Sequence, residues 1–201
     1  MAIIKFIIWV TVAYFIGNIS PSILLAKVKG IDIKKEGSGN AGTTNALRVL
    51  GKKAAIVTLI IDIGKGLLAV FLGMHFGNYE IGIVCALAVF CGHIWPCLYK
   101  FKGGKGVATA FGAIIAVNWT LALLVLLVVA IGVAATQRMS VGSILGAASF
   151  PVICWVFEPG FLYVGIVMAL IVIIKHRANI KRLIKGEEPK MFSKKEDKNE
   201  Q

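Results

Sequence analysis

Acidic residues are scarce in this sequence. The 201 residues include ten Asp and Glu against 22 Lys and Arg, and charged residues make up only 16% of the chain. An ordinary soluble domain carries roughly 25% charged residues. The deficit argues against that class, and the sequence also lacks the acidic pair that a glycoside hydrolase needs.

Cysteine patterns that bind metals are also missing. The four cysteines, Cys85, Cys91, Cys97 and Cys154, all lie in apolar segments, and none belongs to a C-x-x-C pair or has histidines at metal-ligand spacing. We expect them to be buried structural thiols, and we expect neither a metal nor a cofactor.

Apolar residues dominate the chain, at 58% of the total with a mean hydropathy of +0.83. This composition predicts an all-α integral membrane protein. We expect a single polytopic membrane domain over residues 1–190 and a disordered basic and polar tail over 191–201. The first apolar stretch has no small-residue cleavage site, so it is expected to be a span and not a signal peptide. About seven transmembrane helices are predicted, over 3–25, 54–74, 80–99, 107–118, 119–136, 141–157 and 160–174.

Basic residues alternate with these spans. With seven crossings, the segments 26–53, 100–106, 137–140 and 175–201 share one side and carry 20 of the 22 Lys and Arg. The positive-inside rule then places the N-terminus outside and the C-terminus in the cytoplasm. The same distribution explains the net charge of +12 without a nucleic-acid partner. Segment 107–118 is short for a hydrocarbon core of ~30 Å, so whether it fully spans is left open.

The stretch 36–51, EGSGNAGTTNALRVLG, is the most polar and glycine-dense part of the chain. Its turned backbone N–H groups, its hydroxyls and Arg48 are suited to hold a phosphate. Residues 37–42 fit G-x-G-x-x-G, but apolar spans flank them where a dinucleotide fold needs a βαβ unit. Residues Thr43–Leu50 are predicted to form a short helix with Thr43 or Thr44 as N-cap and Gly51 after its end. The alternative is a flexible loop between helices.

Two further basic segments are candidates for anion binding. In FKGGKGVAT (101–109), glycines surround Lys105 at the start of a predicted helix, although the spacing is not that of a Walker A loop. In KHRANIKRL (175–183), His176 and Asn179 are three residues apart and face the same way on a helix. The alternatives are a basic turn at the membrane edge and a juxtamembrane helix on anionic lipid.

Weaker signals come from the segment RMSVGS (138–143) and from charges inside predicted spans. Ser140 could be an N-cap, so the choice between Ser140 and Ser143 as a site residue is open. Asp62 and Lys65 are costly in hydrocarbon unless paired, and we expect a structural ion pair that supports the cytoplasmic loops. His93 is expected to pack beneath those loops.

Taken together, these loops carry several phosphate-binding groups but no evident nucleophile–base pair. The chain also lacks the HxxxxD pattern of the soluble-type glycerolipid acyltransferases. The residues favour an enzyme with phosphorylated and lipidic substrates. The main alternative is a transporter or channel for a phosphorylated metabolite, whose sites usually lie near the midplane of the membrane. A membrane scaffold protein is a third alternative.

Over nearly its whole length the chain resembles the bacterial membrane acyl-phosphate:glycerol-3-phosphate acyltransferases, the PlsY family. The resemblance rests on four motifs in order: GSGNAGTTNALRVLG (37–51), GHIWPCLYKFKGGKGVAT (92–109), RMSVGS (138–143) and KHRANIKRLIKGEE (175–188). One mismatch is Thr43, where the family often has alanine. The resemblance implies transfer of a fatty acyl group from acyl phosphate to the 1-hydroxyl of glycerol 3-phosphate, giving lysophosphatidic acid and inorganic phosphate. It further implies a multi-pass protein of the bacterial plasma (inner) membrane that contacts membrane lipid, with its active site on the cytoplasmic face.

The same resemblance assigns roles to residues that match the motifs. It implies that acyl phosphate is bound by Ser38, Gly39, Asn40, Gly42, Asn45, Gly103, Gly104 and Gly106. It implies that glycerol 3-phosphate is bound by Arg48, Lys105, Ser143, His176 and Asn179. The expected catalytic residues are Ser38, Arg48, Lys105, His176 and Asn179. Either His176 or a phosphate oxygen of the substrate would accept the hydroxyl proton.

Overall fold

The computed structural model describes residues 2–191, which are helical apart from their connections. The predicted tail lies outside the described residues, except for Met191. The helices are α1 (Ala2–Asn18), α2 (Pro21–Val28), α3 (Thr43–Leu50), α4 (Lys52–Phe76), α5 (Tyr79–Ile94), α6 (Val107–Val117), α7 (Trp119–Thr136), α8 (Met139–Phe157), α9 (Leu162–Lys175) and α10 (Arg177–Ile184), with short 3-10 turns at Cys97–Tyr99 and Pro159–Phe161.

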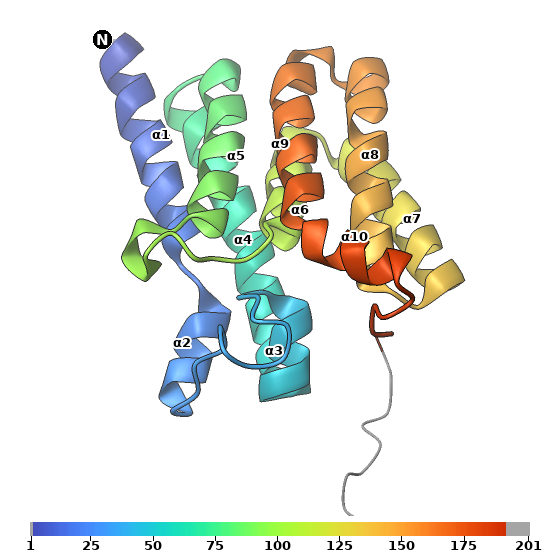
Figure 1. Cartoon of the computed structure of the whole chain (residues 1–201). Coiled ribbons are helices and arrows are strands. Elements are labelled where there is room, and N and C mark those ends of the chain that lie inside the picture. Colours follow the sequence, from blue (N-terminus) through green and yellow to red (C-terminus); the bar gives the residue numbers. More distant parts are fainter. Residues whose placement is uncertain (1, 192–201) are drawn as a thin grey trace, which may run out of the picture.

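The longer helices stand side by side, and the three shortest gather at one end of the bundle (Figure 1). Helix α4 packs on α5 and α6, α1 packs on α5, and α8 packs on both α7 and α9. Helices α2, α3 and α10 lie at the end opposite the start of the chain (Figure 1). The connection 100–106 reaches the same end, so the three basic segments of the sequence share one face.

The expected class of an all-helical integral membrane protein is confirmed. Within residues 2–191, five stretches are long and apolar enough to cross a membrane: Ala2–Val28, Lys52–Phe76, Tyr79–Tyr99, Trp119–Thr136 and Met139–Phe157. The pair Pro159–Lys175 and Arg177–Ile184 brings the count to six if its 54° bend is one broken span. Helix α6 has only 11 residues, about 16 Å at 1.5 Å per residue. Seven full crossings therefore stay a prediction.

The first span, predicted over 3–25, corresponds to the candidate stretch Ala2–Val28, in which the helix is interrupted between α1 and α2. Pro21 has no N–H to donate and disfavours helical geometry in the residue before it. Ser20 accordingly has extended torsions, φ −118° and ψ 93°. The break leaves the carbonyl of Ile19 without a helical partner, and Lys65 takes that place, as described below.

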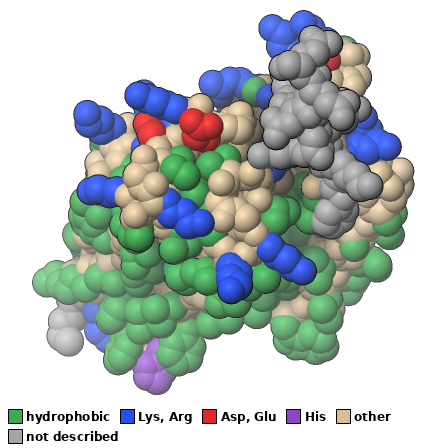
Figure 2. Space-filling view, turned by 90° about the horizontal axis from the view of Figure 1, so that it is seen from below, with side chains coloured by type: hydrophobic (Ala, Val, Ile, Leu, Met, Phe, Trp, Pro, Cys, Tyr) green, Lys and Arg blue, Asp and Glu red, His purple; other side chains and the backbone are tan. Residues whose placement is uncertain are grey.

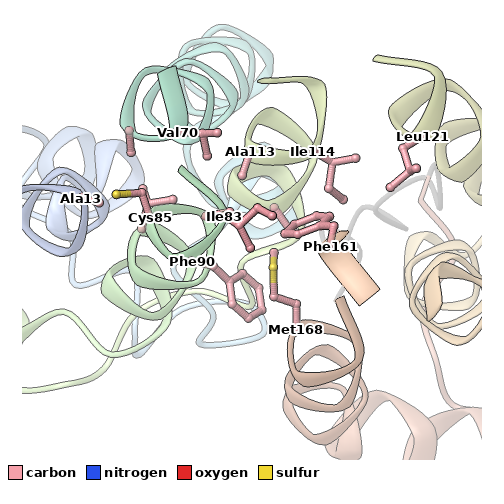
Figure 3. Close-up of a cluster of buried hydrophobic side chains, with 14 of the residues drawn as sticks. Ala13, Val70, Ile83, Cys85, Phe90, Ala113, Ile114, Leu121, Phe161 and Met168 are labelled. Atoms are coloured by element: carbon pink, nitrogen blue, oxygen red, sulfur yellow. The ribbon is translucent and has the colours of Figure 1, made fainter. Parts of the chain in front are cut away.

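The main core lies where α4, α5, α6 and α9 meet. Val70, Ala113, Ile114, Phe161 and Met168 are all almost completely buried and converge there (Figure 3). Glycines let α4 and α6 approach closely: a Cβ at Gly66 would overlap the carbonyl of Thr109. This core fixes the membrane helices whose polar ends form the site.

A second, smaller core supports the glycine-dense loop. Its buried residues come from α2, the loop and α3: Ala26, Ile33, Ala41, Ala46 and Leu50. The loop is therefore a packed structure, and the alternative of a flexible interhelical connection is not what the structure shows.

Candidate active site

A cavity of about 350 Å³ opens among α3, α4 and α6 to α10. Part of its wall is polar and contains the cations Arg48 and Lys105: Ser38, Asn40, Asn45, Arg48, Lys105, Ser140, Ser143, His176, Asn179 and Glu188. Most of the remainder is apolar and includes Phe111, Ile114, Val125, Leu126, Val129, Ala147, Phe150, Met168, Ala169 and Val172. Such a wall fits a ligand with an anionic group and a hydrocarbon part.

Basic side chains also mark the surface around the polar end. Seen from the end that carries α2, α3 and α10, Lys and Arg side chains are spread over the face and few acidic ones accompany them (Figure 2). This face is expected to attract anionic substrates.

The glycine-dense loop forms one wall of the cavity and depends on two left-handed residues. Gly37 and Gly39 have φ of 58° and 69°. A Cβ at Gly37 would overlap Oδ1 of Asn45, and one at Gly39 would lie 2.9 Å from the carbonyl of Lys34. Both the torsions and the lack of space require glycine at these positions.

Asn45 holds this loop in place from the first turn of α3. Its Oδ1 accepts a hydrogen bond from the Ser38 N–H at 2.8 Å. Its Nδ2 donates to the carbonyls of Ile33, at 3.2 Å, and Glu36, at 3.0 Å. Asn45 is 1% exposed. Both polar atoms of the amide are thus engaged within the loop, where they position Ser38.

The start of α3 faces the cavity without a side-chain cap. The predicted helix Thr43–Leu50 is confirmed, but Gly42 is its N-cap and the expected capping by Thr43 or Thr44 is wrong. Within residues 2–191 the buried Thr43 hydroxyl has no hydrogen-bond partner. Uncapped N–H groups and the helix dipole favour an anion here, and Arg48 from the same helix adds a charge to the wall.

The segment before α6 brings Lys105 to the opposite wall. Gly103 and Gly104 donate their N–H groups to the carbonyls of Ile94, at 3.1 Å, and His93, at 3.2 Å. Gly106 has φ 82°, caps α6 and lines the cavity, whereas Gly103 and Gly104 do not line it. These last two glycines seat the segment on the end of α5.

Lys105 reaches across the cavity to the last helix. Its Nζ donates to Oδ1 of Asn179. Burial lowers the pKa of Lys105 to about 8, and the charges of Arg182 and Arg48 act in the same direction against the opposing effect of Glu188. Lys105 is thus protonated at neutral pH, but it loses its proton at a lower pH than an ordinary lysine.

Glu188 is the group that the sequence analysis missed. Its carboxylate accepts hydrogen bonds from Ser140 Oγ at 2.7 Å, Asn179 Nδ2 at 2.6 Å and Arg182 Nε at 2.7 Å. Burial alone would raise the pKa of Glu188, but these three hydrogen bonds outweigh it and the pKa is lowered. The scarcity of acids in the basic motif 175–188 was the available signal, since Glu187 and Glu188 are the only acidic residues of that motif.

The structure also separates the two serines of α8. Ser140 is not an N-cap, because Arg138 takes that position and Ser140 binds Glu188. Ser143 is 5% exposed, lines the cavity and donates to the carbonyl of Met139 at 2.9 Å. Its oxygen therefore keeps acceptor capacity within the cavity wall.

His176 lies at the bend between α9 and α10, beyond the last residue of the apolar helix. Its Nδ1 donates to the carbonyl of Val172 at 2.8 Å, which leaves Nε2 as an acceptor. Burial and the nearby Lys105 lower the pKa of His176 to about 4. The ring is therefore neutral at pH 7. As the sequence predicted, His176 and Asn179 face the same cavity, despite the bend.

Most of the predicted site residues come together in one place. Ten of them line the cavity: Ser38, Asn40, Gly42, Asn45, Arg48, Lys105, Gly106, Ser143, His176 and Asn179. The three that do not are Gly39, Gly103 and Gly104. Segments about 70 residues apart in the sequence thus form a single site.

Comparison with known proteins gives concordant results. The family model described as glycerol-3-phosphate acyltransferase matches residues 7–186. A glycerol-3-phosphate acyltransferase of Clostridioides difficile is 44% identical over 98% of this chain and 100% of its own length. One of Finegoldia magna is 46% identical over 90% of this chain and 93% of its own.

Two crystal structures share the fold. Both are of PlsY (YgiH), an integral membrane glycerol 3-phosphate acyltransferase, and both are 34% identical to this chain. The glycerol 3-phosphate form has a TM-score of 0.89 and covers 94% of this chain and 96% of the other. The lysophosphatidic acid form has a TM-score of 0.85, with 92% and 94% covered.

Proposed function

Because this chain belongs to the glycerol-3-phosphate acyltransferase family, we propose that it transfers a fatty acyl group from acyl phosphate to the 1-hydroxyl of glycerol 3-phosphate. The products would be lysophosphatidic acid and inorganic phosphate, at the first step of phospholipid synthesis. Family membership favours an enzyme over the transporter and scaffold alternatives. The observation that carries the proposal is that one cavity joins a polar end, which contains Arg48 and Lys105, to an apolar end.

The donor phosphate would bind at the loop wall. Ser38, Asn40 and the uncapped start of α3 supply a hydroxyl, an amide and backbone N–H groups on one side of the cavity. Asn45 would act by holding Ser38. The acyl chain would lie along the apolar wall between α6, α7, α8 and α9.

The acceptor would bind between Arg48 of the loop wall and the opposite wall that carries Lys105. Arg48 and Lys105 supply positive charge for the phosphate of glycerol 3-phosphate, and Asn179 fixes Lys105 across the cavity. Ser143 and His176 would orient the hydroxyl. Alignment of two bound reactants supplies much of the catalysis when the donor is already activated.

In the proposed step, the 1-hydroxyl oxygen of the acceptor attacks the carbonyl carbon of acyl phosphate. A new C–O ester bond forms and the bond between the carbonyl carbon and the phosphate oxygen breaks, so that phosphate leaves. Lys105 and Arg48 would stabilise the negative charge that develops. The hydroxyl proton would pass to a phosphate oxygen. A phosphate with a second pKa near 6 is a better base at neutral pH than His176, whose pKa is about 4.

We further propose that the cavity opens to the cytoplasm from the bacterial plasma membrane, with seven crossings and the N-terminus outside. Support comes from the gathering of the basic segments at the end of the bundle that also carries α2, α3 and α10 (Figures 1 and 2). Labelling of single introduced cysteines at Asn78 and Lys102 in intact cells would test it. Reaction of Asn78→Cys alone with an impermeant reagent is expected, and the reverse pattern would contradict the orientation.

The activity is tested with purified protein in nanodiscs. Acyl phosphate, acyl-CoA and acyl carrier protein would each be offered with glycerol 3-phosphate, and both lysophosphatidic acid and released phosphate would be measured. We expect turnover with acyl phosphate alone and its loss in Arg48→Ala. Turnover with acyl-CoA in its place would overturn the proposed donor, and no transfer from any donor would overturn the enzyme.

A further inference from the structure

A cluster of three buried ionisable residues lies beneath the cationic wall. Asp62 and Lys65 come from α4 and His93 from α5, and they are 1%, 4% and 5% exposed. The expected ion pair between Lys65 and Asp62 is present, with Nζ 2.7 Å from Oδ1. Asp62 and His93 also line the cavity, so the cluster belongs to its wall as well as to the helix bundle.

The Lys65 ammonium donates hydrogen bonds to two groups and forms an ion pair with a third. Nζ lies 2.6 Å from the carbonyl of Ile19, 2.8 Å from Nδ1 of His93 and 2.7 Å from Asp62. The Ile19 carbonyl is the one that the break before Pro21 leaves without a helical partner. Nδ1 of His93 also lies 3.4 Å from Oδ1 of Asp62, so both members of the ion pair face this ring nitrogen. The cluster therefore fixes the place of the His93 ring.

His93 in turn supports the segment that ends in Lys105. Its carbonyl accepts the N–H of Gly104 at 3.2 Å. Its Nε2 lies so close to Gly104 that an added Cβ would overlap it, and the same Cβ would be 2.8 Å from the carbonyl of Ala41 in the opposite loop. Gly104 is thus held between His93 and the glycine-dense loop, one residue before Lys105.

We propose that Asp62, Lys65 and His93 are positioning residues that fix Lys105 against Asn179 in the active site. The chain of contacts runs from Lys65 through the His93 ring to Gly104 and Lys105. An ion pair with a purely structural role could lie anywhere in the bundle. This one holds His93, which contacts the backbone of Gly104 next to Lys105. The inference rests on the proposed function, in which Lys105 binds glycerol 3-phosphate.

The test compares variants of the full chain in nanodiscs. His93→Gln replaces one neutral group by another, and Asp62→Asn with Lys65→Met removes both charges together so that no unpaired charge stays buried. Val70→Ala is the matched control, because Val70 is a fully buried α4 residue that does not line the cavity. Thermal unfolding, kcat, the KM of each substrate and the pH profile would be measured.

We expect both cluster variants to raise the KM of glycerol 3-phosphate and to lower its kcat/KM by on the order of 10- to 100-fold, the scale of a small misplacement. The KM of acyl phosphate should change far less. The alkaline limb of the pH profile should move to higher pH, because a displaced Lys105 is less buried. Val70→Ala should lower the unfolding temperature and leave the KM values and the pH limb in place.

The proposal is overturned if the cluster variants behave like Val70→Ala, with lower stability and unchanged kinetics. If the double variant does not fold, His93→Gln decides the matter. Loss of fold in His93→Gln as well would make the cluster a folding determinant and would also overturn the proposal. A wild type without acyl transfer is a separate result, which overturns the proposed function.

Discussion

The two polar walls of the cavity are built in different ways. The loop wall, formed by residues 36–48, is held by contacts within about a dozen residues, through Asn45 and two left-handed glycines. The opposite wall is a network of side chains from three distant segments: Lys105, Ser140, Asn179, Arg182 and Glu188. A local motif thus forms the loop wall, whereas the network of the opposite wall forms only when distant helices pack together.

Removing the cation of the network should have the largest effect. Lys105→Met is expected to lower kcat/KM by on the order of 10²- to 10³-fold, the scale of losing one group that stabilises developing charge. Steady-state kinetics in nanodiscs would measure it. Lys102→Met, which removes an exposed lysine from the same segment, is the control and should retain activity. Equal losses in both variants would assign the effect to general surface charge.

Breaking the loop wall should affect the other substrate. Asn45→Ala removes three hydrogen bonds that hold the loop, one of them from the Ser38 N–H, and is expected to raise the KM of acyl phosphate by roughly 10- to 100-fold, through misplacement of the loop. The KM of glycerol 3-phosphate should change much less. Asn78→Ala, which loses an N-cap that accepts the Ile81 N–H at 2.9 Å, is the control without a kinetic effect. Equal rises in both KM values would show that the walls are not independent.

Alkaline pH should weaken the network and spare the loop. The folded pKa of Lys105 is about 8, below the usual lysine value, so the cation is present below that pH and is lost as pH rises through it. The kcat/KM for glycerol 3-phosphate should therefore fall about tenfold for each pH unit above 8. Lys105→Arg, whose side chain stays charged, should lack this limb. If kcat/KM still fell above pH 8 in Lys105→Arg, the titration of another group would be responsible.

The smallest effect is expected at the apolar end of the cavity. Phe150 is 4% exposed, lines the cavity and stacks edge-on against Phe161 at 5.8 Å. Phe150→Ala should favour long-chain over medium-chain acyl phosphates by a few-fold, about 1 kcal/mol, because it lengthens the apolar wall. Competition assays would measure the ratio. Phe157→Ala, at the exposed end of the same helix, should leave the ratio unchanged.

The contrast between the walls also explains what sequence could predict. The helix Thr43–Leu50, the shared direction of His176 and Asn179, and the ion pair of Asp62 with Lys65 follow from local spacing and were predicted correctly. The wrong predictions concern a helix end where glycine takes the cap position and a residue whose partner is distant in the sequence. Gly42 caps α3 instead of a threonine, and Ser140 binds a carboxylate 48 residues away.

The role of Glu188 shows most clearly what could not be predicted from the sequence. No local pattern marks a glutamate after a basic helix as a partner of Ser140 and Asn179, because the contact depends on how α8 meets α10. The break before Pro21 could have been predicted from the proline alone. The place of Gly103 and Gly104 could not, since both rest on the far end of α5.

The position of Glu188 in the chain has a consequence for biosynthesis. A ribosome makes the glycine-dense loop and Lys105 early, but the partners Asn179 and Glu188 emerge after the last apolar helix. A nascent chain that has inserted α1 to α8 therefore contains the loop wall but lacks Asn179 and Glu188, which complete the opposite wall. Catalytic competence should appear only after Asn179 and Glu188 have been made, so chains truncated before them would occupy the membrane without consuming acyl donors.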